Sequence, residues 1–163
     1  MRVTAVYAGS FDPVTKGHAN VIRRALSMFF KVYAAVGKNT SKKCLFDENE
    51  RIGFIENEFT DDELNVGLYV ATFDGLLVDF CKKVGAKVIV RGLRAVTDFE
   101  YELGMAHANH SQVADIETVF LPTLPEYSFV SSSTVKELAR WGGDVSQFVS
   151  PTVAAALKGK FPR

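Results

Sequence analysis

Short β-prone apolar runs alternate with amphipathic helical patterns along the whole chain. Apolar residues at helical spacing predict helices over Ala19–Phe29, Leu76–Val84 and Asp98–Asn109. Runs rich in valine, isoleucine and aromatic residues predict strands over Val3–Ala8, Val32–Val36, Leu64–Val70, Lys87–Val90 and Thr118–Leu121. Gly67 interrupts the third of these runs and weakens it as a strand. The pattern therefore predicts a regular succession of strands and helices.

Polar residues mark the starts of further helices. A capping residue followed three positions later by a glutamate, or directly by proline, is typical of a helix start. The candidates are Asp47 with Glu50, Thr134 with Glu137, and Ser150 with Pro151. We expect the acidic run Asp61–Glu63 to form a solvated turn.

Strands this short and apolar, alternating with helices, are typical of βαβ units in a parallel sheet covered on both faces. The 163 residues suit one domain with one core, and no internal repeat or linker divides them. We predict an α/β fold, a single doubly wound domain over residues 1–163 with about five parallel strands. Ligands of such sheets bind at the carboxyl ends of the strands, where the strand order reverses.

Composition and charge exclude several classes of partner. Lysine plus arginine and aspartate plus glutamate number 19 each, so no global positive field would gather nucleic acid or an acidic membrane surface. No apolar run approaches the ~20 residues of a membrane helix, and the start of the chain is too short in apolar residues for a secretion signal. Cys44 and Cys81 have no disulfide or CxxC spacing. We expect a cytoplasmic protein without nucleic-acid or membrane partners.

The first chemical motif is Gly9–His18, GSFDPVTKGH, between the first predicted strand and the first predicted helix. Gly9 permits a close backbone turn, and Ser10 offers a hydroxyl to a phosphate oxygen. His18 falls in the first turn of the helix, where free N–H groups and the helix dipole favour anions. A solvent-facing cap histidine is the alternative interpretation, but it does not explain the spacing of the other residues. The glycines do not fit a P-loop or GxGxxG.

Two further motifs carry groups that suit phosphate. Ser131–Ser133 precedes a predicted helix, and three hydroxyls exceed the single one that N-capping needs, which contributes about 1 kcal/mol. Arg91 and Arg94 flank Gly92 directly after the clearest buried strand. Guanidinium groups bind phosphate oxygens in a bidentate manner, so this pair can hold two phosphates.

These motifs resemble those of a known family. The first stretch is similar to the (T/S)FDPxxxGH signature of the nucleotidyltransferase superfamily, and residues 130–140 resemble its ISSSxVKExAR signature. The stretch 91–102, RGLRAVTDFEYE, is similar to that of bacterial phosphopantetheine adenylyltransferases. The resemblance covers nearly the whole chain. It implies a Rossmann-like fold and transfer of AMP from ATP to 4′-phosphopantetheine, giving dephospho-coenzyme A and pyrophosphate by direct in-line attack on the α-phosphorus.

The resemblance also implies roles for individual residues. His18 and Lys42 would be catalytic. The ATP side would comprise Ser10, Phe11, His18, Gly92, Leu93, Arg94, Glu102, Tyr127, Ser128, Phe129, Val130, Ser131, Ser132 and Ser133. The phosphopantetheine side would comprise Ser10, Lys42, Leu77, Arg91 and Asn109. Without the resemblance, Lys42 would be an ordinary loop lysine.

Cofactor and partners follow from the same resemblance. Mg²⁺ is expected on the ATP phosphates, held mostly through them, with no metal ligands among the protein side chains. His107 and His110 share a helix face but lack an evident third ligand, so no metal site is predicted there. The resemblance also implies a homohexamer and coenzyme A as a feedback inhibitor.

Two rival functions stay open at this point. One keeps the superfamily and changes the substrate, to nicotinamide mononucleotide or to CTP; the 91–102 stretch argues against both. The other is a nucleotide-sensing module without turnover, which retention of both His18 and Lys42 disfavours. RNA binding has little support at zero net charge.

Overall fold

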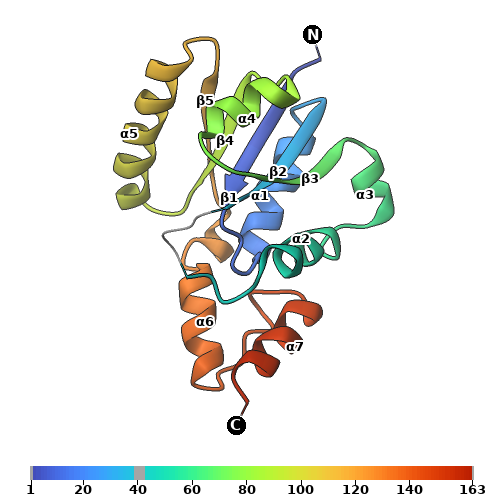
Figure 1. The fold of residues 1–163 in the computed structure, drawn as a ribbon. Helices are drawn as coiled ribbons and strands as arrows, with labels where there is room; N and C mark the ends of the chain where they lie inside the picture. The colour runs from blue at the N-terminus through green and yellow to red at the C-terminus, as the bar shows by residue number, and fades with distance from the viewer. Residues whose placement is uncertain (1, 39–42, 163) are drawn as a thin grey trace.

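The computed structural model describes residues 2–38 and 43–162. Five parallel strands form one sheet in the order β3-β2-β1-β4-β5 (Figure 1). They are β1 (Thr4–Gly9), β2 (Lys31–Gly37), β3 (Leu68–Phe73), β4 (Val88–Leu93) and β5 (Glu117–Pro122). The helices are α1 (Lys16–Leu26), α2 (Glu48–Glu56), α3 (Asp61–Asn65), α4 (Leu77–Val84), α5 (Val96–Gln112), the 3₁₀ helix η1 (Pro125–Tyr127), α6 (Ser132–Arg140) and α7 (Pro151–Lys160). The predicted α/β fold with about five parallel strands is confirmed.

The strand order reverses at β1. The chain builds outward from β1 to β2 and β3, then crosses back so that β4 pairs with the other side of β1. Ala8 lies opposite Ala35 of β2, and Val6 lies opposite Ile89 of β4. The connections after β1 and β4 therefore diverge and leave a crevice at the carboxyl ends of these two strands.

Alternate residues of the strands pack on opposite faces of the sheet. Ala5 and Tyr7 of β1 join the larger hydrophobic cluster with residues of α1, α2, α6 and α7. Val6 and Ala8 join the smaller cluster, which includes buried residues of α4. Because both faces are covered, the central parts of the strands are mainly apolar, as the sequence pattern indicates.

The two C-terminal helices close one end of the sheet. Figure 1 shows α6 and α7 at the end of the molecule opposite the N-terminus, beyond the carboxyl ends of the strands. Val135 of α6 and Val153 and Leu157 of α7 are completely buried. As predicted, Ser150 caps α7 and proline occupies its first turn. This packing brings a late segment of the chain against the loop that follows β1.

The region before β3 differs from the prediction. Asp61–Glu63 is not a turn but the start of α3, where Thr60 and Glu63 form a capping box. The strand begins at Leu68, directly after Gly67, whereas the predicted strand contained Gly67. Gly67 has φ = +121°, and a Cβ there would lie 2.6 Å from the carbonyl oxygen of Phe30. Only glycine fits this close approach, so Gly67 marks the boundary of the strand.

Two helix starts test the capping predictions. Asp47 and Glu50 cap α2 reciprocally, as predicted. The pair Thr134 and Glu137 was the wrong choice for α6, because Ser131 is the cap and accepts a hydrogen bond from the Thr134 N–H at 3.0 Å. The serines are therefore part of the helix start rather than of a loop ahead of it.

The helix after β4 also starts earlier than predicted. α5 begins at Val96, two positions before Asp98, and none of its 17 residues is buried. Val96 and Tyr101 are 81% and 68% exposed. Within the described ranges, no helix is both long and apolar enough to cross a membrane.

Candidate active site

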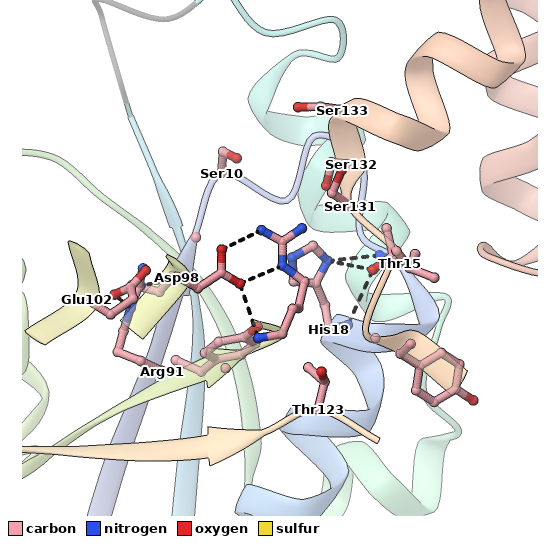
Figure 2. Close-up of a pocket in the computed structure, with 18 residues that line it drawn as sticks. Ser10, Thr15, His18, Arg91, Asp98, Glu102, Thr123, Ser131, Ser132 and Ser133 are labelled. Carbon is pink, nitrogen blue, oxygen red and sulfur yellow. Dashed lines mark hydrogen bonds and ion pairs between the residues drawn. The ribbon is translucent and has the colours of Figure 1, made fainter. Parts of the chain in front are cut away.

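A cavity of about 330 Å³ lies at the crevice between β1 and β4. Its walls come from the end of β1, the start of α1, the end of β4, α5, and the segment around η1 and α6 (Figure 2). The lining residues are Tyr7, Ala8, Gly9, Ser10, Thr15, Gly17, His18, Arg91, Gly92, Arg94, Asp98, Glu102, Thr123, Tyr127, Val130, Ser131, Ser132 and Ser133. The three motifs, from the start, the middle and the last third of the sequence, thus share one cavity.

His18 and Thr15 hold each other at the start of α1. The Thr15 backbone N–H donates to Nδ1 of His18 at 3.1 Å, and the Thr15 hydroxyl oxygen accepts from the His18 backbone N–H at 3.4 Å. His18 thus occupies the position that glutamate takes in an ordinary capping box. Figure 2 shows these bonds beside the cavity. His18 is a cap histidine after all, but one that lines a pocket instead of facing solvent.

The bond from Thr15 fixes which nitrogen of His18 carries the proton. A backbone N–H can only donate, so Nδ1 is the acceptor and the neutral ring carries its proton on Nε2. Burial, together with the nearby Arg94 and Arg91 cations, lowers the pKa of His18 to about 4. The ring is therefore neutral near pH 7 and offers one N–H donor. A bound polyphosphate would reverse the local charge and raise this pKa.

Phe11 packs against the ring of His18. Its side chain is 1% exposed, and its ring packs edge-on against those of His18 and Tyr7, with centroids 5.2 and 5.6 Å apart. The backbone of Phe11 has φ = +45°, which is unusual for a residue other than glycine. This conformation puts the Phe11 ring into the core, while the neighbouring Ser10 lines the cavity.

Arg91 links the ends of β4 and β1. One terminal nitrogen donates to the Ala8 carbonyl oxygen at 2.7 Å, and the other donates to Oε1 of Glu102 at 2.6 Å. Burial by itself would lower the pKa of Arg91, but the hydrogen bond and charge of Glu102 outweigh it and raise the pKa. Arg91 is thus a permanent cation at the crevice.

Arg94 forms a second ion pair on the same wall. Its Nε and one terminal nitrogen donate to the two carboxylate oxygens of Asp98 at 3.0 and 3.1 Å. The Arg94 backbone N–H also donates to Asp98, at 3.1 Å. Burial would raise the pKa of Asp98, yet the bonds from Arg94 lower it. Both arginines of the motif therefore face the cavity with a carboxylate partner from α5.

The serine segment forms the opposite wall. Ser131 caps α6, and the Ser132 hydroxyl donates to the Pro13 carbonyl oxygen at 2.8 Å. Tyr127 packs close to Gly17, where an added Cβ would lie 3.4 Å from the Cβ of Tyr127. Hydroxyl groups and the start of a helix therefore face Ser10 and His18 across the cavity.

Several predicted site residues lie elsewhere. Lys42 is outside the described residues. Six further predicted residues do not line this cavity: Phe11, Leu93, Ser128, Phe129, Leu77 and Asn109. Leu77 packs beside the smaller hydrophobic cluster, at the start of α4. Phe129 is 63% exposed and packs edge-on against Phe148. Among the residues that the structure describes, no group of three or more His, Cys, Asp or Glu side chains could hold a metal.

The comparisons with known proteins agree with the geometry. A family model described as cytidylyltransferase-like matches residues 6–138. A phosphopantetheine adenylyltransferase from Thermodesulfovibrio yellowstonii is 51% identical over 164 residues, covering all of both chains. One from Streptomyces coelicolor is 53% identical over 153 residues, 94% of either chain. The chain belongs to the phosphopantetheine adenylyltransferase family.

Members of this family are nucleotidyltransferases, so the predicted enzyme class is confirmed. The structure of a Plasmodium falciparum nicotinic acid mononucleotide adenylyltransferase complexed with NaAD has a TM-score of 0.72, covering 99% of this chain and 96% of that chain. At 12% identity it shows a shared Rossmann-like fold alone.

Some residues of the site were not predicted from the sequence. Thr123 and Asp98 line the cavity, and Thr15 orients His18. Thr15 was detectable in principle, because it stands three residues before His18 as a cap stands before its partner. Thr123 carries no local signal; it lies in the cavity because it directly follows β5, beside β4.

Proposed function

We propose that the protein transfers the AMP part of ATP to 4′-phosphopantetheine, giving dephospho-coenzyme A and pyrophosphate. One observation carries this proposal beyond family membership. The loop after β1, the arginines after β4 and the serines before α6 line a single cavity. These groups offer N–H and hydroxyl donors and fixed cations to two phosphate-bearing substrates, as a direct transfer requires.

An oxygen of the acceptor phosphate would attack the α-phosphorus in line. A new bond forms between that oxygen and phosphorus, and the bond to the bridging oxygen breaks, so that pyrophosphate leaves with the electron pair. The acceptor phosphate is already ionised near neutral pH, and no protein nucleophile or strong base is needed. The protein's task is then to align two anions and to stabilise charge on the equatorial oxygens.

The arrangement supports distinct roles for the cavity residues. The neutral His18 would donate from Nε2 to an α-phosphate oxygen, and Ser10 would bind between the two substrates. Arg91 would hold the acceptor phosphate. Arg94 and the serines at the start of α6 would bind the β- and γ-phosphates. Lys42 is proposed as the second charge-stabilising group on the resemblance alone.

The other proposed contacts fit more loosely. Tyr127 and Val130 line the cavity and suit the nucleoside part of ATP. Glu102 is engaged by Arg91, so we propose that it orients this arginine in addition to its implied contact with ATP. Leu77 and Asn109 would contact the pantetheine arm outside the cavity.

Mg²⁺ fits the site as an ion bound mainly to the phosphates of the nucleotide. The carboxylates in the cavity, Asp98 and Glu102, are both engaged by arginines, and the remaining donors are mainly hydroxyls. This donor set suits a metal carried on the phosphates with water in its shell. When bound, Mg²⁺ would neutralise phosphate charge.

The wider biology is proposed on similar grounds. We propose a homohexamer, and the exposed apolar side chains of α5, Val96 and Tyr101, support an assembly surface there. Native mass spectrometry tests this.

Coenzyme A is proposed as a feedback inhibitor because it contains the phosphopantetheine group. Cys44 and Cys81 are free thiols, which supports a reducing, cytoplasmic location.

One assay tests the proposed function. The purified protein is incubated with ATP, Mg²⁺ and 4′-phosphopantetheine, and dephospho-coenzyme A and pyrophosphate are quantified. We expect equimolar products. Nicotinamide mononucleotide in place of the acceptor, and CTP in place of ATP, serve as matched controls that should give little turnover. ATP binding without pyrophosphate release for any acceptor would instead support a nucleotide-sensing module.

A further inference from the structure

The buried polar side chains gather around one loop. Among the described residues, the buried polar or charged side chains are Asp12, Thr15 and Arg51. Asp12 and Thr15 belong to the loop between β1 and α1, and Arg51 of α2 donates to the Ser10 carbonyl oxygen at 2.7 Å. Burial of polar groups is costly unless they are bonded. Their concentration here indicates that the position of this loop matters.

Asp12 makes contacts that local sequence does not explain. Its carboxylate accepts hydrogen bonds from the backbone N–H groups of Leu45 and Phe46 at 3.0 Å. It also accepts from Nζ of Lys136 at 2.7 Å, across a separation of 124 positions in the chain. The Asp12 side chain is 5% exposed and that of Lys136 is 27% exposed. The carboxylate is therefore shielded from water, and its bond to the partly exposed Lys136 is strengthened by charge.

Lys136 stands one turn into α6, whose first residues are the serines of the cavity. The pair with Asp12 thus ties the loop that carries Ser10 to the helix that carries Ser131–Ser133. The bond from the Ser132 hydroxyl to the Pro13 carbonyl oxygen closes the same junction. Asp12 and Lys136 do not line the cavity themselves. They lie behind it.

We propose that Asp12 and Lys136 are positioning residues: their ion pair sets the separation of the two phosphate-binding loops, and so the alignment of the ATP triphosphate. This inference rests on the proposed function, in which the triphosphate spans both loops. A ligand that reaches only one of the loops does not depend on the pair. ATP reaches both loops, whereas AMP lacks the β- and γ-phosphates and reaches only the loop after β1. The two ligands therefore provide this contrast.

The test replaces Lys136 by methionine, which keeps length and removes charge. Asp12 keeps its two backbone donors in this variant. A misplaced phosphate chain is expected to lower kcat about 10-fold to 10²-fold. We expect ATP to bind about 10-fold more weakly, while AMP binding changes less than about twofold. Lys136→Arg retains the cation and should restore most of kcat.

Lys87→Met is the matched control. Lys87 pairs with Asp115 at 3.5 Å, on the surface, with side chains 65% and 82% exposed. Its loss should leave kcat and both affinities unchanged. Should Lys136→Met not fold, the double variant Asp12→Asn/Lys136→Met is used, because it leaves neither charge buried alone.

A purely structural pair would give a different result. The variant would then unfold at lower temperature, but the folded protein would keep its kcat and the same ratio of ATP to AMP affinity. That outcome overturns the inference. Failure of the proposed function is separate: the wild-type protein would make no dephospho-coenzyme A, while the comparison of ATP with AMP binding would still test the pair.

Discussion

Two walls of the cavity, the loop after β1 and the arginine segment after β4, are built in different ways. The loop after β1 is held by deeply buried residues, with whole-residue exposures of 3% for Asp12, 2% for Thr15 and 5% for Arg51. Asp12 and Arg51 bond mainly to backbone groups, and Asp12 also pairs with Lys136. The arginine wall after β4 is held by ion pairs that are more open to solvent. Side-chain exposures there are 26% and 13% for Arg91 and Glu102, and 38% and 26% for Arg94 and Asp98.

The difference indicates which groups can respond to substrate. Asp12 and Arg51 do not line the cavity, so a bound phosphate would not compete for their partners, and we expect the first loop to keep its shape when a ligand binds. A phosphate can replace a carboxylate as the partner of a guanidinium group, because both present oxygens to the same fork. We infer that one wall is preformed, and that the other exchanges carboxylate for phosphate partners when substrates bind.

The largest expected effect comes from the preformed wall. His18→Ala removes the donor proposed for the α-phosphate, and loss of one such donor typically lowers turnover about 10²–10³-fold. ATP should still bind, because Arg94 and the serines remain. Single-turnover kinetics and calorimetric titration with ATP measure the two properties separately. Near-normal turnover would show that His18 does not stabilise the transition state.

Thr15→Val is the companion variant. It removes the hydroxyl that caps α1 and that also lies 3.0 Å from Nδ1 of His18, but it keeps the Thr15 backbone N–H that donates to the same nitrogen. Helix capping contributes about 1 kcal/mol, so we expect lower stability with turnover far closer to wild type than that of His18→Ala.

The second prediction concerns the buried support of the same wall. Arg51→Met leaves the Ser10 carbonyl oxygen without its donor and also removes the weaker bonds to the carbonyl oxygens of Gly37 and Asp47. An unsatisfied buried group costs about 1–3 kcal/mol, so the free energy of unfolding in urea should fall by roughly this amount. Arg24→Met is the control, since Arg24, which is only partly buried, donates to the Pro122 carbonyl oxygen. Equal losses for both would contradict a special role for the buried support.

The sequence predicted the fold more completely than it predicted these supports. Strand and helix periodicity follow from local burial, so β1, β2, β4 and β5 were found within one to three residues. The capping box of Thr60 and Glu63 was present in the sequence but was read as a turn. It has the same spacing as the pair that correctly marked α2.

Long-range partners could not be predicted. The motifs indicated which residue types gather at the crevice, and the cavity contains His18, Arg91, Arg94 and the serines. Nothing local pairs Asp12 with Lys136, because such contacts depend on how α6 packs against the loop. For the same reason Ser131 rather than Thr134 caps α6: Ser132 is bonded to Pro13, which fixes where the helix starts.

The third prediction uses pH to test the burial of His18. Its pKa is about 4 in the folded protein, against about 6.5 for an unfolded histidine. Between these values the unfolded chain binds more protons, so stability falls as the pH decreases from 6.5 toward 4. From pH 7 to pH 5 this loss should be on the order of 1 kcal/mol. Urea unfolding of His18→Gln should show a shallower decline; identical slopes would mean that His18 titrates normally in the folded state.

The smallest expected effect comes from the arginine wall. Asp98→Asn removes the carboxylate that competes with phosphate for Arg94. Because partly exposed ion pairs contribute about 0.2–1 kcal/mol, ATP should bind up to about fivefold more tightly. Calorimetric titration at two salt concentrations measures this. Asp115→Asn, in the exposed pair with Lys87, is the control and should not alter ATP binding. Weaker binding by Asp98→Asn would mean that Asp98 orients Arg94 instead of competing for it.

The central claim is that the cavity aligns two substrates for one direct transfer, with no covalent intermediate on the protein. It is tested most directly by the stereochemistry at the α-phosphorus, using ATP made chiral there by a single sulfur atom, with 4′-phosphopantetheine as acceptor. The account predicts inversion of configuration in the dephospho-coenzyme A product, as a single in-line displacement requires. Retention would reveal two displacements through an adenylylated side chain and would contradict the account.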